Sequence, residues 1–215
     1  MSIGSSVLSQ VSLCAVVVLC LSPARSSEAG PPSDALRAAF GDANTILTDP
    51  TSERHPLERL GAIRALFGSV FDFRGAAERS LGAQWQANSV AEQNEFTRLF
   101  AEFMQRGFVY WLASVADVDT HGAGVTVHFL RESVERETAT VQIAVVGRAG
   151  RLIPVIYDLV YRDRRWMVRD VTIEGVSLVA NYRAQFDRVI RSSSYPELIQ
   201  RMRLRIATGL PRQEQ

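Results

Sequence analysis

The chain has 215 residues, 47% of them hydrophobic and 22% charged, which is enough to bury a core in one ordinary domain or two small ones. This composition excludes disordered and collagen-like chains. The 24 basic residues are all arginine and stand against 23 acidic ones, so we expect no nucleic-acid partner, because phosphate binding needs concentrated positive charge. The lack of lysine also excludes P-loop and Schiff-base chemistry.

An apolar segment at the N-terminus ends in small residues and is followed by a polar stretch. It is short for a membrane span and has the pattern of an export signal, so we predict a signal peptide over 1–29, with cleavage after Ala24 or Ala29. Cys14 and Cys20 lie within it. A mature chain without cysteine forms no disulfide and no thiolate metal site. We therefore expect a periplasmic protein without metal or cofactor.

Residues 30–215 are predicted to form one α+β domain. Apolar residues at helical spacing predict helices over about 34–47, 56–70, 74–81 and 89–115 in a helical part over about 33–115, and C-terminal helices over about 177–207. Ser89 followed by Glu92 forms a capping-box pattern at the start of the longest helix. That helix carries an unusually aromatic stripe, which includes Phe96, Phe100, Phe103 and Tyr110.

From Val125 onward the apolar residues recur at every second position instead. This alternation predicts four antiparallel strands over about 124–173, with connections over 132–137 and 147–151 and a tight turn over 163–165. Gly175 should end the last strand and Ser177 should cap the following helix. Helices packed on a curved four-stranded sheet form a cone like that of nuclear-transport-factor-2-like proteins, with an additional helical part.

Candidate catalytic groups are few. The sequence has no phosphate-binding loop, and His55, His121 and His128 lack the spacing of metal ligands. Because this cone also occurs in isomerases and dehydratases, one alternative is an enzyme in which Asp158 or Asp170, paired with Tyr157 or Tyr161, abstracts a proton from a hydrophobic substrate. We favour the interpretation that both aspartates point away from the apolar face or pair with nearby arginines. Periodicity alone leaves open whether the apolar interior is filled or forms a cavity.

The run Glu174-Gly175-Val176-Ser177, with Tyr157-Asp158-Leu159, Trp166 and Tyr182-Arg183-Ala184-Gln185-Phe186 around it, resembles the signature of the MlaC family of periplasmic phospholipid carriers. This family includes auxiliary components of toluene-tolerance ABC transporters. The resemblance implies a non-enzymatic shuttle that exchanges phospholipid or a related lipid with an MCE-domain subunit of an inner-membrane ABC transporter and with an outer-membrane lipoprotein complex.

A carrier of this kind holds the lipid tails in a hydrophobic pocket. We expect the pocket to be lined by apolar residues of the long helix, the strands and the segment after them: Phe96, Phe100, Phe103, Tyr110, Val127, Phe129, Val141, Ile143, Val155, Tyr157, Leu159, Trp166, Val176 and Phe186.

Overall fold

The computed structural model describes residues 30–50, 55–115, 125–147 and 150–208, with the backbone alone at Pro56 and over 108–115. The predicted signal peptide lies outside this part. Its elements in chain order are α1 (Pro32–Thr48), α3 (Pro56–Val70), α4 (Phe73–Leu81), α5 (Ala83–Ala87), α6 (Val90–Val115), β1 (Val127–Glu135), β2 (Thr138–Val146), β3 (Leu152–Arg162), β4 (Arg165–Ile173), β5 (Val176–Ser177), α7 (Leu178–Ser192) and α8 (Tyr195–Thr208).

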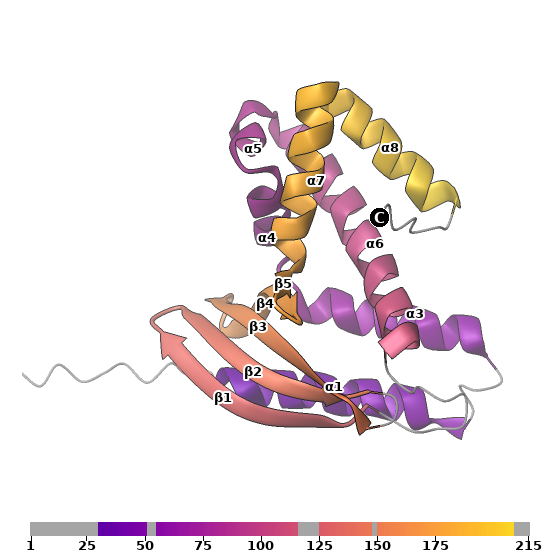
Figure 1. Cartoon of the computed structure of the whole chain (residues 1–215), viewed down its shortest axis with the longest axis vertical. Helices are drawn as coiled ribbons and strands as arrows, with labels where there is room; N and C mark the ends of the chain where they lie inside the picture. Colours follow the sequence, from indigo (N-terminus) through magenta and orange to yellow (C-terminus); the bar gives the residue numbers. More distant parts are fainter. Residues whose placement is uncertain (1–29, 51–54, 116–124, 148–149, 209–215) are drawn as a thin grey trace, which may run out of the picture.

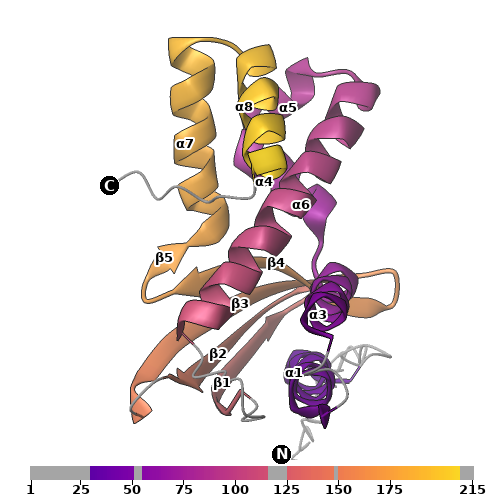
Figure 2. The same cartoon turned by 90° about the vertical axis from the view of Figure 1, so that its right-hand side faces the viewer.

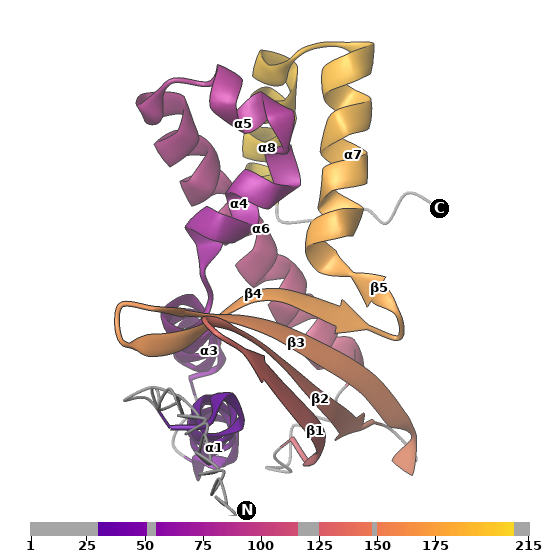
Figure 3. The same cartoon turned by 90° about the vertical axis from the view of Figure 1, so that its left-hand side faces the viewer.

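The strands form one antiparallel sheet in the order β1-β2-β3-β4-β5. Figure 1 shows this curved sheet below a group of helices formed by α4, α5, α6, α7 and α8. Helix α1 packs on β1, β2 and β4, and α3 packs on β4. Figures 2 and 3 show both helices nearly end-on beside the sheet, with α6 in front of the strands in Figure 2 and behind them in Figure 3. The α+β class with an additional helical part is confirmed.

The ends of the elements follow local chemistry. The predicted capping box forms, because the Glu92 carboxylate accepts from the Ser89 N–H at 2.8 Å and the Ser89 hydroxyl accepts from the Glu92 N–H at 3.3 Å. Ser177 caps α7 as predicted, with its hydroxyl accepting from the Ala180 N–H at 3.0 Å. Gly175 has a φ of 85°, a backbone conformation that favours glycine, at the turn after β4.

Three local features differ from the sequence-based prediction. Strand β1 continues to Glu135, so the predicted connection over 132–137 is only a short turn at Arg136 and Glu137. Most of this edge strand is exposed, so its residues show no alternation that a pattern could detect. A two-residue strand, β5, adds a fifth member to the four-stranded sheet, and the short helix α5 follows Gly82.

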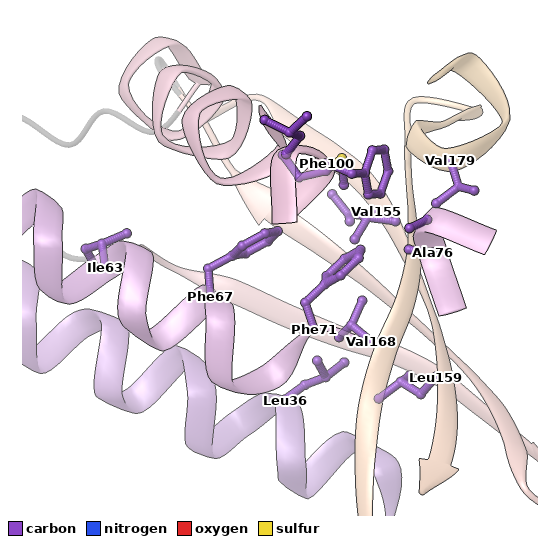
Figure 4. Packing of buried hydrophobic residues seen from close by; sticks show 14 of the residues in the cluster. Leu36, Ile63, Phe67, Phe71, Ala76, Phe100, Val155, Leu159, Val168 and Val179 are labelled. Carbon is purple, nitrogen blue, oxygen red and sulfur yellow. The ribbon is translucent and has the colours of Figure 1, made fainter. Parts of the chain in front are cut away.

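The core extends from α1 and α3 across the sheet to the upper helices. In Figure 4, Phe67 and Phe71 of the α3 region lie beside Val168 of β4, with Val155 and Phe100 above them. The backbone fixes this junction, since the Asp72 N–H donates to the Val168 carbonyl at 2.7 Å. In the described ranges, no helix combines the length and apolar character that crossing a membrane requires.

Candidate functional site

The sheet face that packs against α1, called the inner face below, gathers the apolar side chains of all four long strands. Directly opposed residues of an antiparallel pair share a face, and the register aligns Phe129 with Ile143, Ile143 with Val155, and Val141 with Tyr157. The inner face therefore contains eight of the expected lipid-contacting residues: Val127, Phe129, Val141, Ile143, Val155, Tyr157, Leu159 and Trp166. The sequence prediction that these strand residues lie together is confirmed.

Much of the inner face is closely packed. The side chains of Val141, Ile143, Val155 and Leu159 are each about 1% exposed. Trp166 is also buried, and its indole N–H donates to the Gly30 carbonyl at 3.1 Å. These residues form the floor of the inner face and leave little surface for direct contact with a ligand.

Phe129 and Tyr157 are different, because both are only half-buried. They flank Phe40 of α1, whose ring meets each of theirs edge to face, with centroids 6.3 Å and 6.2 Å apart. Val127 on the same strand as Phe129 is half-buried as well. This group, which we call the inner-face aromatic group (Phe40, Phe129 and Tyr157), therefore retains accessible apolar surface.

The phenol of Tyr157 has no hydrogen-bond partner among the described residues. Burial nevertheless raises the pKa of Tyr157 well above its ordinary value, because the surroundings would poorly solvate a phenolate. The Tyr157 side chain is therefore desolvated, although the residue keeps some accessible surface. Its hydroxyl is a polar group among the apolar residues of the inner face and has no hydrogen-bond partner among the described residues.

A second aromatic group occupies the upper helices. Phe96 and Phe100 of α6 are both 0% exposed, and each meets Phe186 of α7 edge to face, at 5.6 Å and 6.1 Å. Tyr182 stacks on Phe186 and also contacts Phe103. We call these five residues the upper aromatic cluster. Its α6 members face α7, whereas the expected pocket lining grouped them with the strand residues.

Gly107 follows Phe103 by about one turn of α6 and lies at one end of the upper cluster, beside the Tyr182 hydroxyl. A Cβ atom added there would lie 3.4 Å from the Tyr182 hydroxyl, so the missing side chain makes room for the phenol. Burial raises the pKa of Tyr182 to about 12. Half-buried Phe103 contacts Tyr182 at this end of the cluster.

Two expected residues remain. Val176 lies on the edge strand β5, where it is paired with Ile173 and so shares the inner face, but 56% of its surface is exposed. Tyr110 belongs to helix α6, and its side chain lies outside the described residues. The fourteen expected residues are therefore divided between the inner face, the upper cluster and these two positions.

The candidate catalytic aspartates have structural partners. Asp170 is buried, and its carboxylate accepts from the Val179 N–H at 3.1 Å and from the Ser177 hydroxyl at 2.6 Å, which ties β4 to the start of α7. Asp158 alternates with Tyr157 along β3, so it lies on the face opposite to that phenol, where it accepts from Thr140. Neither aspartate is assembled with Tyr157 as the enzyme alternative requires.

One buried acid escaped the sequence analysis. Asp72 caps α4 by accepting from the Gly75 N–H at 3.0 Å and pairs with Arg162 at 3.0 Å. A Phe-Asp-Phe sequence before a short helix is the signal that could have found this cap. Among the described residues no group of three or more His, Cys, Asp or Glu side chains is placed to hold a metal ion.

Helices on one face of a curved antiparallel sheet, with a second helical layer above it, define an architecture that recurs in a solved structure. That structure is titled as the phospholipid-binding protein from Ralstonia solanacearum in complex with a phospholipid. It superimposes with a TM-score of 0.71 and 18% sequence identity, and the match covers 84% of this chain and 99% of that one. The two proteins share a fold.

The model of the family described as MlaC protein matches residues 38–204. The chain therefore belongs to the MlaC family, which confirms the resemblance seen in the sequence. It is also 25% identical over 125 residues to toluene tolerance protein ttg2D of Pseudomonas putida. This match spans 58% of the chain and 56% of that relative, so it covers little more than half the length of the curated protein.

Proposed function

We propose that the protein is a periplasmic carrier of phospholipid or a related lipid, and that the acyl tails contact the inner face around Phe129 and Tyr157. The observation that carries this proposal is the accessible apolar surface of the inner-face aromatic group in a chain of the MlaC family. The fold that the chain shares with the Ralstonia phospholipid-binding protein supports the same ligand class.

The energetics suit a carrier. Each methylene that leaves water for an apolar recess contributes about 0.8 kcal/mol, so two acyl tails supply far more binding free energy than a single polar contact. Release then requires a partner that opens the recess, and no covalent step is involved. The Tyr157 hydroxyl, which has no partner in the described part of the chain, provides a hydrogen-bond donor for an oxygen near the head of the lipid.

The partners follow from the family and are part of the proposal. Lipid would pass between an MCE-domain subunit of an inner-membrane ABC transporter and an outer-membrane lipoprotein complex. The predicted export signal over 1–29 supports a periplasmic location, and the small net charge of +1 suits a protein that must leave anionic membrane surfaces again.

Native mass spectrometry tests the binding function. Protein isolated from a bacterial periplasm should carry the added mass of a phospholipid, which organic extraction removes. Protein with a clean unliganded mass, and with no uptake from phospholipid vesicles after extraction, would contradict the proposal.

A pair of matched variants locates the site. Val127→Trp adds bulk at a half-buried position of the inner face and should prevent uptake. Leu152→Trp introduces the same side chain at a residue of β3 that is 58% exposed and paired with Val146 on the opposite face of the sheet, and should leave uptake unchanged. Equal loss in both variants would place the lipid elsewhere.

A further inference from the structure

Arg37 of α1 is placed on the apolar inner face in an unusual way. Its guanidinium carbon lies 3.9 Å from the centre of the Phe129 ring, within the range of a cation–π contact. The side chain is exposed, and no hydrogen bond or ion pair to it is present among the described residues. The cation thus lies against the Phe129 ring, and no described residue accepts a hydrogen bond from its N–H groups.

A second arginine on an aromatic ring shows how different this is. Arg74 lies over Trp85 at 5.4 Å, but its N–H groups donate to Asn94 at 3.0 Å and to Gln93 at 3.4 Å. The N–H donors of Arg74 are therefore used in hydrogen bonds within the protein. At Arg37, by contrast, no described residue accepts a hydrogen bond from the guanidinium.

Asp34 precedes Arg37 by three residues on α1, yet no ion pair between them is present among the described residues. Glu132 of β1 accepts from the Ser33 N–H at the start of the same helix. An arginine is weakly hydrated and presents a planar fork of donors that matches a phosphate oxygen pair. Stacking on Phe129 fixes the orientation of that fork in advance, so less entropy is lost when an anion binds.

We propose that Arg37, stacked on Phe129, binds the phosphate group of the carried lipid at the rim of the inner face. This inference rests on the proposed lipid-carrier function. Phe129 connects the two parts of the ligand, since its ring packs on Phe40 at the inner face and carries the Arg37 cation at the exposed side. Tails on the inner face then place the phosphate beside the guanidinium.

The test compares two ligands that have the same acyl chains and differ in the phosphoglycerol head group. The protein, purified from a periplasm and freed of lipid, is titrated with dioctanoyl-phosphatidylglycerol and with dioctanoylglycerol, and bound fractions are measured by native mass spectrometry. Arg37→Gln should weaken phosphatidylglycerol binding about tenfold or more, as expected when a charge-assisted contact is lost, and leave dioctanoylglycerol binding unchanged. Arg37→Lys should restore only part of the affinity, because lysine lacks the planar fork.

The controls separate the possible failures. Arg98→Gln removes an exposed arginine of α6 that has no ion pair within the described ranges, and should affect neither ligand. If Arg37→Gln weakened both ligands equally, or neither, Arg37 would not be a phosphate contact and the carrier function would stand. Saturable binding of inorganic phosphate that requires Arg37 and is not displaced by phosphatidylglycerol would identify a free-phosphate site instead. A wild-type protein that bound neither lipid would overturn the carrier function itself.

Discussion

The upper aromatic cluster and the inner-face aromatic group contain similar residues but differ in how deeply these residues are buried. In the upper cluster, Phe96 and Phe100 are fully buried against Phe186, so none of their apolar surface is accessible to a ligand. On the inner face, Phe129 and Tyr157 are half-buried, and the Tyr157 hydroxyl has no protein partner among the described residues. Aromatic content alone therefore does not mark a ligand site, whereas aromatic surface that the fold leaves accessible does.

The largest expected effect separates stability from binding. Phe100→Ala should lower the free energy of unfolding by about 3 to 5 kcal/mol, because it opens a cavity in a fully packed cluster. Phe129→Ala should cost about 1 to 2 kcal/mol, since its ring is only half-buried, but it should remove most lipid uptake. Urea denaturation of lipid-free protein measures the free energy of unfolding of both variants. A larger loss of stability at Phe129 would reverse the roles assigned to the two groups.

The next effect concerns the link between the sheet and the upper helices. Asp170→Ala should lower the free energy of unfolding by about 2 to 3 kcal/mol, because the buried Val179 N–H loses a charged acceptor. Ser177→Ala, which removes only the cap of α7, should cost about 1 kcal/mol. Thermal unfolding of both variants gives the comparison. Unchanged stability with altered ligand turnover in the Asp170 variant would instead support the enzyme alternative.

A smaller effect tests the unpartnered phenol. Tyr157→Phe should leave the stability of lipid-free protein unchanged or raise it by up to about 1 kcal/mol, because the hydroxyl is partly desolvated and has no hydrogen-bond partner among the described residues. Lipid affinity should fall a few-fold if the hydroxyl donates to the ligand. Chemical denaturation and lipid titration of the same samples measure both. A marked loss of stability would mean that the hydroxyl has a partner in the fold.

The smallest expected effect is on stability and concerns the capping box of Ser89 and Glu92, which is not part of the proposed lipid site. The Ser89 hydroxyl and N–H, both donors to the Glu92 carboxylate, lower the pKa of Glu92 below its ordinary 4.5. A lowered folded-state pKa contributes stability that is present above about 4.5 and is lost as the pH falls through the folded pKa. The melting temperature of Glu92→Gln should therefore lie slightly below that of the wild type near neutral pH, and the difference should close in acid. A constant difference would contradict the capping-box assignment.

Much of the fold was predictable because local patterns determine it. The helical spacing in α3 and α6, the caps at Ser89 and Ser177 and the alternation of β2 and β3 all encode their structures locally. Strand β1 was predicted too short, because an exposed edge strand carries charges in place of an alternating pattern.

The candidate site was less predictable, for a physical reason. Periodicity identifies which residues are apolar on one face, but the depth of burial depends on partners from distant parts of the chain. Phe96 and Phe129 look alike in sequence, and only the packing of α7 on one and α1 on the other distinguishes them. The stacking of Arg37 on Phe129 joins α1 to β1 across nearly a hundred residues and has no local signature.

Photo-crosslinking with a phospholipid whose acyl chain carries a diazirine tests the central claim most directly. The lipid is loaded into the protein and irradiated, and labelled peptides are mapped by mass spectrometry. Labels should fall on the peptides that contain Val127, Phe129 and Tyr157 of the inner face. Labels concentrated instead on peptides with Phe96, Phe100 and Phe186 would show that the upper aromatic cluster opens to hold the tails, and would contradict the account.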